Sequence, residues 1–262
     1  MGRKVHPLLG ISAGLVFLFL IAPLVLVLGA AFNDATYLAF PPQSLSLRWF
    51  ERVLSLQNFM DAFLVSLTVA ISATALALLV GIPTSYAIVK HRGSFPSWFS
   101  SVFFLPLLVP EIVFGFSLLK TVIVALELPV MTALIAGHTI LVLPYAVRVL
   151  GASLSNFDFS AEEAAVSLGM HPLKTVLAVV LPNIKAGILA AFILAFITSL
   201  NDVSVSLFLT GPGVSTLQVE VLTYVEQYFD PSVAAVSVLL MAITLVVMVV
   251  LERSFGLSNV VK

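Results

Sequence analysis

The chain has 262 residues, of which 60% are apolar and only 10% are charged, and its formal net charge is -1. Soluble domains average about 25% charged residues, so this chain has too few charges to cover a water-facing surface of its size. The composition argues against a soluble enzyme, a disordered chain and a nucleic-acid binder. Cysteine is absent, which excludes disulfides, thiolate metal sites and cysteine nucleophiles.

Long uncharged runs predict an all-α membrane protein with six transmembrane helices, because a helix needs about 20 apolar residues to cross a bilayer. The predicted spans are residues 9–31, 62–89, 99–120, 129–150, 176–200 and 231–251. Pro182, Asn183 and Lys185 interrupt the first half of the fifth span, although a helix starting at Pro172 would still reach across. No linker separates two parts, so we expect residues 1–262 to form a single transmembrane domain.

The first span has an alternative interpretation as a cleaved signal peptide. Arg3 and Lys4 precede its apolar run, and the small residues Gly29, Ala30 and Ala31 follow. The run is longer than the apolar part of a signal peptide, which has about 7–15 residues. A membrane span is therefore the favoured interpretation.

Basic residues near span ends predict the orientation, because they concentrate on the cytoplasmic side. One side holds Arg3, Lys4, Lys90, Arg92, Arg148, Lys174, Arg253 and Lys262, with Lys185 close by, and the other side holds Arg48 and Arg52, with Lys120 at a span edge. Both termini should therefore be cytoplasmic. The outward loops are then residues 33–61, 121–128 and 201–230, and the inward loops are residues 90–98 and 151–175.

The first outward loop contains a candidate amphipathic helix over Leu47–Phe59. Trp49 and Phe50 are expected at the level of the lipid headgroups, where aromatic side chains are enriched. Membrane lipid is therefore an expected partner of the chain.

Glu111 lies inside the third predicted span, directly after Pro110. An ionisable residue at membrane depth is costly and is by default a candidate for function. Glu111 is therefore predicted to line a solute pathway, where a carboxylate would attract an amine. The alternative is a structural carboxylate, bonded to a neighbouring helix or a partner subunit. His138, in the fourth span, is expected to form hydrogen bonds between helices.

The inward loop 151–175 carries the clearest local signals. Ser160 and Glu163 have the spacing of a capping box, which predicts that a helix begins at Ser160. Gly169 suits the position just after a helix, and Pro172 suits the first position of the next one. A short rigid helix over 160–169 on the cytoplasmic side is suited to docking in a groove of another protein. The alternative is an ordinary connecting helix.

Asn201 and Asp202 end the fifth predicted span near the outer face, and Ser204 follows them. These three residues are predicted to belong to the solute pathway or its gate. The alternative for Asp202 is a helix end in water, although the helix dipole does not favour a carboxylate there.

The loop helix carries a resemblance to a known family. Glu163-Ala164-Ala165, three residues, Gly169, nine residues, Val179, one residue and then Leu181-Pro182 resemble the EAA motif of binding-protein-dependent ABC importer permeases. Val179 replaces the more usual isoleucine of that motif. The resemblance implies a type I ABC importer permease architecture in the bacterial inner membrane. It also implies that residues 160–169 form the coupling helix in a groove of the ATPase, with contacts from Ser160, Glu162, Glu163, Ala164, Ala165, Leu168 and Gly169.

Two other segments narrow the resemblance. Pro110-Glu111-Ile112-Val113 and the segment from Ser199 to Pro212 look like the second permease of spermidine/putrescine-type importers. The resemblance implies a second permease, two ATPase subunits and an extracytoplasmic solute-binding protein as partners, and a polyamine as the solute. An opine, a phosphonate or another small organic solute is the main alternative.

The chain lacks the residues of an ATPase. The segment nearest to a Walker A motif, Gly169–Thr175, has neither the second glycine nor the required spacing. We expect a partner chain to bind ATP and magnesium, and this chain to have no cofactor, metal site or catalytic residue of its own. The rivals are a secondary transporter driven by an ion gradient, for which no internal repeat is visible, and a membrane enzyme or assembly factor.

Overall fold

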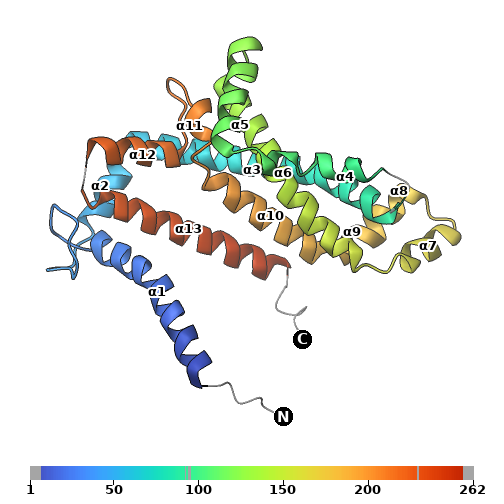
Figure 1. The fold of residues 1–262 in the computed structure, drawn as a ribbon, viewed down its shortest axis with the longest axis horizontal. Helices are drawn as coiled ribbons and strands as arrows, with labels where there is room; N and C mark the ends of the chain where they lie inside the picture. Colours follow the sequence, from blue (N-terminus) through green and yellow to red (C-terminus); the bar gives the residue numbers. More distant parts are fainter. Residues whose placement is uncertain (1–6, 92, 94–95, 229, 256–262) are drawn as a thin grey trace. The chain divides into compact units, whose positions relative to one another are not determined.

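The computed structural model describes residues 7–91, 93, 96–228 and 230–255, and the regular elements in these ranges are all helices (Figure 1). In chain order they are α1 Pro7–Ala31, α2 Arg48–Ser55, α3 Gln57–Lys90, α4 Ser97–Val102, the 3-10 helix η1 Leu105–Leu108, α5 Glu111–Leu118, the π-helix η2 Leu119–Ala125, α6 Val130–Ser155, α7 Ser160–Ser167, α8 Pro172–Thr175, the π-helix η3 Val176–Val180, α9 Leu181–Asn183, α10 Lys185–Leu200, α11 Ser206–Leu209, α12 Leu217–Gln227 and α13 Ser232–Phe255. The all-α prediction is therefore confirmed.

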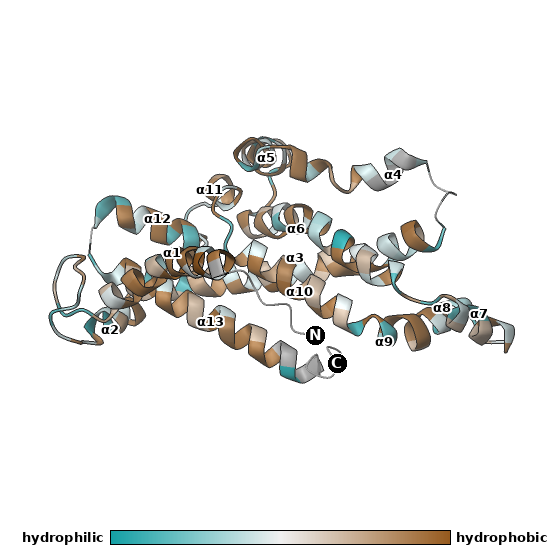
Figure 2. Cartoon of the chain, turned by 60° about the horizontal axis from the view of Figure 1, so that its bottom comes forward, coloured by the Kyte–Doolittle hydropathy of each residue, from teal (hydrophilic) through white to brown (hydrophobic). Residues whose placement is uncertain are grey.

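Four of the predicted spans lie on single helices that are long and apolar enough to cross a membrane: α1, α3, α6 and α13. Figure 2 shows apolar residues along most of their length. The fifth predicted span is a helix pair, Pro172–Asn183 and Lys185–Leu200, that is bent by 74°. The count of six spans and the cytoplasmic termini stay predictions. Part of the charge argument for the termini rests on Arg3, Lys4, Arg92 and Lys262, which lie outside the described residues.

Residues 99–120 do not form the single helix expected of the third span. They are divided among α4, η1, α5 and η2. Pro106 and Pro110 explain the breaks, because proline has no backbone N–H and disfavours helical geometry in the residue before it. Val109, just before Pro110, is extended, with φ -89° and ψ 129°. Pro110 then starts a new helix with Glu111 in its first turn.

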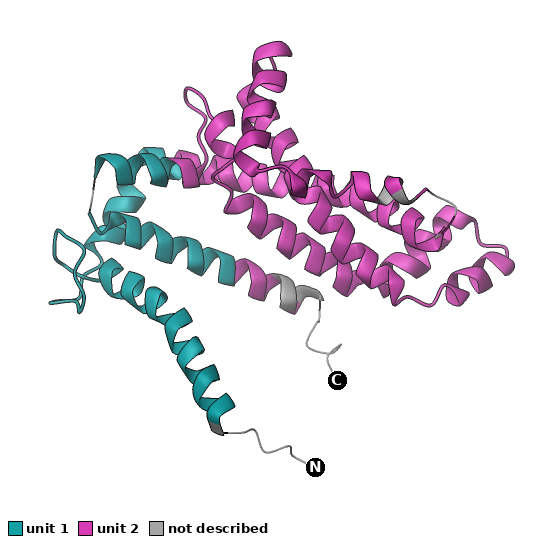
Figure 3. Ribbon diagram, viewed as in Figure 1, with its two compact units in different colours: residues 1–60, 220–245 teal, residues 61–219, 246–262 magenta. Residues whose placement is uncertain are grey.

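The described chain divides into two compact units, which are drawn in two colours in Figure 3. Unit 1 consists of residues 1–60 and 220–245, and unit 2 consists of residues 61–219 and 246–262. The expectation of a single transmembrane domain over 1–262 stays a prediction.

Unit 1 is held together around the start of α2. Trp49 is 2% exposed, and its indole N–H donates to the carbonyl of Asn33 at 2.9 Å. The rings of Phe32 and Phe50 lie 4.9 Å apart. Trp49 therefore packs inside the unit, and its predicted level at the lipid headgroups stays a prediction. A buried indole needs a hydrogen-bond acceptor, and the Asn33 carbonyl supplies it.

Unit 2 has a core built mainly from α3, α6 and α10, with α5 and α11 packed at one end. Helices α6 and α10 pack closely at Gly187. A Cβ atom built on Gly187 would lie 2.2 Å from the Ser153 hydroxyl and 2.3 Å from the Ser153 Cβ. Without a side chain at residue 187, the two backbones can pack at this separation.

We therefore expect Gly187→Ala to destabilise the folded chain. The extra methyl group would overpack the crossing by about 1–3 kcal/mol, since a serine is too short to swing out of the way. The matched control is Gly151→Ala on α6, where nothing lies within 4 Å of the added atom. The thermal midpoint of the detergent-purified protein should fall for Gly187→Ala and hold or rise for Gly151→Ala. Equal midpoints for the two variants would contradict the close crossing.

Candidate functional site

The candidate site in the predicted inward loop is built on α7, and the start of this helix is stabilised by Asp158. The Asp158 carboxylate accepts the backbone N–H of Ser160 at 3.0 Å. Hydrogen bonds from the backbone and side chain of Ser160 hold the pKa of Asp158 below its ordinary value. The N–H of Glu163 donates to the carbonyl of Phe159 at 3.0 Å, as in an ordinary helical turn. The predicted capping box is therefore wrong, because the side chain that accepts a backbone N–H at the start of the helix is Asp158 and not Ser160.

The end of α7 follows the sequence prediction. Gly169 has φ +89°, the left-handed conformation that glycine adopts without strain. Its N–H donates to the carbonyl of Val166 at 2.9 Å, and the N–H of Met170 donates to the carbonyl of Ala165 at 3.1 Å. These two bonds form a Schellman motif, which satisfies the last carbonyls of the helix. Helix α8 then begins at Pro172, as expected.

One face of α7 is anchored by Glu162. This side chain is 1% exposed. Its Oε1 atom accepts from the Tyr86 hydroxyl at 2.6 Å and from the Lys90 ammonium, which also donates to the Tyr86 hydroxyl at 2.8 Å. Tyr86 and Lys90 are four residues apart on α3, so they lie on the same face of that helix. We call Glu162, Tyr86 and Lys90 the latch, because they tie α7 to the end of α3.

The other face of α7 is exposed. Glu163 and Ala164 are exposed, as is Ser160 at the start of the helix, whereas Ala165 is half-buried. Leu168, at the end of the helix, is 90% exposed, the highest value among the large apolar side chains that the structure describes. An apolar side chain of this kind has little reason to stay in water, so the face has the chemistry of a contact surface. The predicted coupling residues thus divide into an internal anchor, Glu162, and an exposed group around Glu163 and Leu168.

Glu111 lies in the first turn of α5 and is exposed. Its carboxylate is at the end of the helix where the dipole stabilises negative charge. Among the described residues it has no hydrogen bond or ion pair. Its place in the solute pathway stays a prediction.

Asp202 is buried, and its place in the solute pathway or gate stays a prediction, as do those of Asn201 and Ser204. It is 7% exposed, and its carboxylate accepts from the N–H of Val205 at 3.3 Å, the N–H of Ser206 at 2.8 Å and the hydroxyl of Ser206 at 2.9 Å. The neighbouring Asn201 is exposed and accepts from the Gln218 amide at 3.3 Å, and Ser204 is half-buried. Asp202 therefore caps α11, and the structure does not bring it together with Glu111 at one surface.

His138 completes the network around Asp202. Its Nδ1 atom lies 2.8 Å from the Ser199 hydroxyl and its Nε2 atom 3.0 Å from the Ser206 hydroxyl. Since Ser206 donates to Asp202, it accepts from the imidazole, and a neutral ring protonated at Nε2 satisfies every bond. The prediction that His138 bonds between helices is confirmed, because the network joins α6 to α10 and α11. We call His138, Ser199, Asp202 and Ser206 the buried network.

The sequence reasoning missed the latch. Lys90 entered only as a charge for orientation, and Tyr86 did not enter at all. The available signal was the spacing of Tyr86 and Lys90 at the end of a span facing an inward loop with two adjacent acids, Glu162 and Glu163. Residue spacing cannot show which of the two neighbouring acids is buried against α3. Only the three-dimensional structure shows that it is Glu162.

Residues 77–256 match the family model of the binding-protein-dependent transport system inner membrane component. The chain belongs to this family. It is a multi-pass permease of the bacterial inner membrane, as the EAA motif had indicated, and it resembles the polyamine permeases, as residues 110–113 and 199–212 had indicated.

Named relatives span most of the chain. It is 31% identical over 234 residues to the putrescine transport system permease protein PotI of Escherichia coli strain K12, which covers 86% of this chain and 82% of PotI. It is 28% identical over 235 residues to the spermidine/putrescine permease PotC of Haemophilus influenzae, covering 89% and 91% of the two chains. It is also 26% identical over 250 residues to PhnV of Salmonella typhimurium, a putative 2-aminoethylphosphonate permease, covering 93% and 92%.

Solved structures agree on the fold. A chain from a bacterial ABC transporter that imports the acidic polysaccharide alginate gives a TM-score of 0.71 at 15% identity, covering 97% of this chain and 98% of the other. A chain of the inward-facing MetNI methionine ABC transporter gives 0.64 at 17% identity, covering 77% and 98%. The fold is therefore that of an ABC importer permease.

Proposed function

We propose that this permease is one of two transmembrane subunits of an ATP-driven importer for a small amine, most specifically a polyamine. A second permease, two ATPase subunits and an extracytoplasmic binding protein complete the assembly. The ATPase subunits bind ATP and magnesium, and this chain contributes no catalytic group. The observation that carries the proposal is α7, a short helix stopped at both ends, with an anchored face and an exposed face that bears the EAA motif.

The exposed face of α7 docks in the ATPase. The latch then transmits the movement of α7 to α3. When ATP closes the ATPase dimer, α7 moves with its groove. Because Glu162 is bonded to Tyr86 and Lys90, the end of α3 moves with α7. Alternating access then follows from a rigid-body shift between two states that make different contacts, with no chemistry in this chain.

The relatives support an amine as the solute. Putrescine and spermidine carry primary amines, and so does 2-aminoethylphosphonate. A primary alkylamine has a pKa near that of lysine, about 10.4, and is a cation at neutral pH. A polyamine is the first candidate, because the putrescine permease is 31% identical to this chain. The aminophosphonate is the second candidate.

A pull-down of the tagged chain in mild detergent tests the assembly, with mass spectrometry of the proteins that accompany it. We expect an ATPase, a second permease and a solute-binding protein. The recovered binding protein is then screened by thermal shift against putrescine, spermidine and 2-aminoethylphosphonate. Recovery of the chain alone, in a detergent that preserves a known importer, would favour a secondary transporter. Uptake that is abolished by an uncoupler but insensitive to ATP depletion would support the same rival.

Leu168→Asp is expected to weaken association with the ATPase. It places a charge where an apolar side chain that is 90% exposed would be buried by docking, and we expect ATPase recovery to fall by about tenfold. Leu45→Asp is the matched control, because Leu45 is 80% exposed and belongs to a predicted outward loop. Recovery should be unchanged in the control. Equal recovery for both variants would contradict docking through this end of α7.

A further inference from the structure

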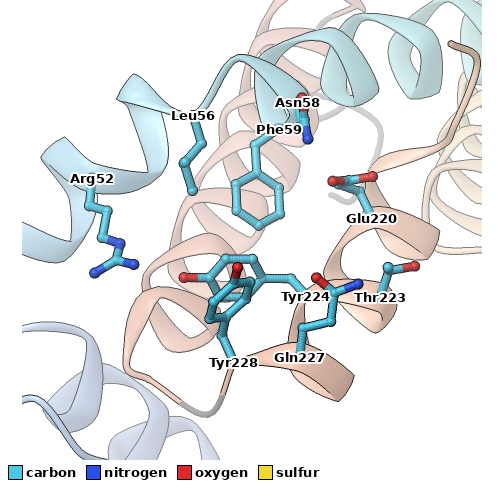
Figure 4. Close-up of a pocket in the computed structure, with 9 residues that line it drawn as sticks. All are labelled: Arg52, Leu56, Asn58, Phe59, Glu220, Thr223, Tyr224, Gln227 and Tyr228. Atoms are coloured by element: carbon cyan, nitrogen blue, oxygen red, sulfur yellow. The ribbon is translucent and has the colours of Figure 1, made fainter.

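A cavity of about 290 Å³ lies within unit 1, between α2, the first turn of α3 and α12 (Figure 4). We call it the outer pocket, because both segments that form it belong to predicted outward loops. Its size is close to the lower end of the range of small-molecule sites, about 300–1,000 Å³. It is lined by Arg52, Leu56, Asn58, Phe59, Glu220, Thr223, Tyr224, Gln227 and Tyr228.

The middle of the lining is aromatic. The ring centroids of Phe59 and Tyr224 are 5.2 Å apart, and those of Tyr224 and Tyr228 are 5.0 Å apart. Phe59 is 4% exposed and forms the base of the cluster, whereas Tyr228 is 52% exposed and lies toward the opening. The Tyr224 hydroxyl donates to Asp230 at 2.9 Å, which fixes its ring. Such rings cover a methylene chain well, and their faces attract a cation.

The charges of the outer pocket leave one carboxylate without a partner. Arg52 and Glu220 lie on opposite sides of the aromatic cluster in Figure 4. Arg52 is compensated by Asp230 at 3.6 Å, and its guanidinium also lies 5.7 Å from the Trp49 ring centre. Glu220 is half-buried, with no ion pair or hydrogen bond among the described residues. The pocket therefore has an excess negative charge at the Glu220 end.

Burial raises the pKa of the Tyr224 hydroxyl. Loss of water around it raises its pKa above the ordinary value, and the hydrogen bond to Asp230 acts in the same direction. The ring is then a neutral phenol at any physiological pH. The negative charge available to a ligand comes from Glu220, which can accept hydrogen bonds through both of its oxygen atoms.

We propose that the outer pocket binds a primary alkylammonium group, with Glu220 accepting from the ammonium and Tyr224 and Tyr228 covering the carbon chain. The proposal deepens the proposed function and rests on it: the ligand is the amine end of the solute after release from the binding protein. A short aliphatic chain fits the aromatic wall, and a single positive charge matches Glu220. An anionic ligand would meet Glu220 unpaired and Arg52 already compensated.

Direct binding tests the proposal. The importer is assembled in nanodiscs with its ATPase subunits and without the binding protein, and tritiated putrescine is titrated onto it. We expect saturable binding that unlabelled butylamine displaces and 1,4-butanediol, which has the same carbon chain without charge, does not. Glu220→Gln should weaken binding by about tenfold, because the amide oxygen still accepts from the ammonium but no longer carries a charge. Tyr228→Leu should weaken it less.

The matched control is Glu226→Gln, which removes an exposed carboxylate from the same helix but outside the pocket. Its putrescine affinity should equal that of the unchanged importer. Glu220→Asp keeps the charge and should retain most of the binding. If Glu220→Gln does not assemble with the ATPase, Tyr228→Leu takes its place, because its side chain is 52% exposed and the substitution stays apolar. Unchanged putrescine affinity in Tyr228→Leu would then contradict the proposal.

Three results would overturn the outer pocket as a solute site. One is no saturable putrescine binding in the importer with its natural sequence. Another is equal putrescine binding in Glu220→Gln, with unchanged affinity for the unliganded binding protein. The third is a Glu220→Gln importer that binds putrescine normally but loses affinity for the unliganded binding protein. In that case the ammonium group that Glu220 binds would belong to a lysine of the binding protein and not to the solute. In each case the proposed function would still be supported if the binding protein is specific for polyamines and its addition still stimulates polyamine uptake. A binding protein with no affinity for amines would count against the proposed function instead.

Discussion

Replacing Lys90 with methionine is expected to lower ATP-driven uptake by about tenfold or more, while the protein still reaches the membrane. Glu162 is 1% exposed, and its Oε2 atom has no hydrogen bond among the described residues. Within the described part of the chain, Lys90 supplies the only positive charge bonded to Oε1. Without Lys90, a buried carboxylate would stay charged without a counter-ion, take up a proton, or swing out to water. Each of these would loosen the hold of α3 on α7.

The readout separates coupling from folding. In proteoliposomes, solute uptake and ATP hydrolysis are measured together, with loaded binding protein present. We expect Lys90→Met to keep its ATPase subunits but to transport fewer solute molecules per ATP hydrolysed. Lys174→Met is the matched control, because Lys174 is an exposed lysine on α8 outside the latch. Its coupling ratio should be unchanged.

A double variant makes the prediction sharper. Replacing Lys90 and Glu162 together by methionine removes the buried charge along with its partner, and apolar replacements of a buried ion pair are often close to neutral for stability. We expect the double variant to recover the thermal midpoint lost in Lys90→Met. A Lys90→Met importer with a normal coupling ratio would show that the latch has no part in transmission.

Asp202→Ala is expected to act on folding and assembly, leaving solute affinity unchanged. The substitution leaves the N–H groups of Val205 and Ser206 without their acceptor inside a buried segment. Each buried donor left unpaired costs about 1–3 kcal/mol. The Ser206 hydroxyl also loses its acceptor. This hydroxyl is then no longer held in the orientation that accepts a hydrogen bond from His138. The amount of folded complex recovered from membranes should fall several-fold.

The comparison with two milder variants decides between structure and pathway. Asp202→Asn keeps an oxygen that can accept the Ser206 N–H, and we expect most of the complex to survive. Asn201→Ala changes the exposed neighbour and should have little effect on complex yield. The concentration dependence of uptake is then measured for each complex that assembles. A normal yield with a raised KM in Asp202→Asn would support the predicted place of Asp202 in the solute pathway.

The long spans could be predicted because their signal is length and apolarity, which need no partner. Helices α1, α3, α6 and α13 lie where the uncharged runs had placed them. Residues 99–120 have the same apolar composition, but Pro106 and Pro110 divide them, and hydropathy does not record a missing backbone N–H. Pro182, Asn183 and Lys185 marked an interruption in the fifth predicted span, but the size of its bend, 74°, could not be predicted. Its angle depends on packing between elements that are distant in sequence.

At the candidate site, local signals were predicted and burial was not. Gly169 was recognised because a left-handed helix end has a strong residue preference. Asp158 was overlooked since Ser160 and Glu163 offered an equally regular capping pattern. Asp202 was assigned to the pathway on the cost of a charge at membrane depth. The Asp202 carboxylate is stabilised by hydrogen bonds from two N–H groups and one hydroxyl of the next four residues. These bonds could not be predicted from residue spacing.

The two adjacent acids of α7 have a consequence for insertions and deletions. Glu162 points into the latch and Glu163 points to solvent, and consecutive residues of an α-helix are turned by about 100° from one another. One residue gained or lost between Asp158 and Glu162 would rotate every later side chain of α7 by that amount. Glu162 would leave its lysine, and the exposed end at Leu168 would face a different direction. The length of this segment is therefore more tightly constrained than the identity of its exposed residues, and a working homologue should align here without gaps.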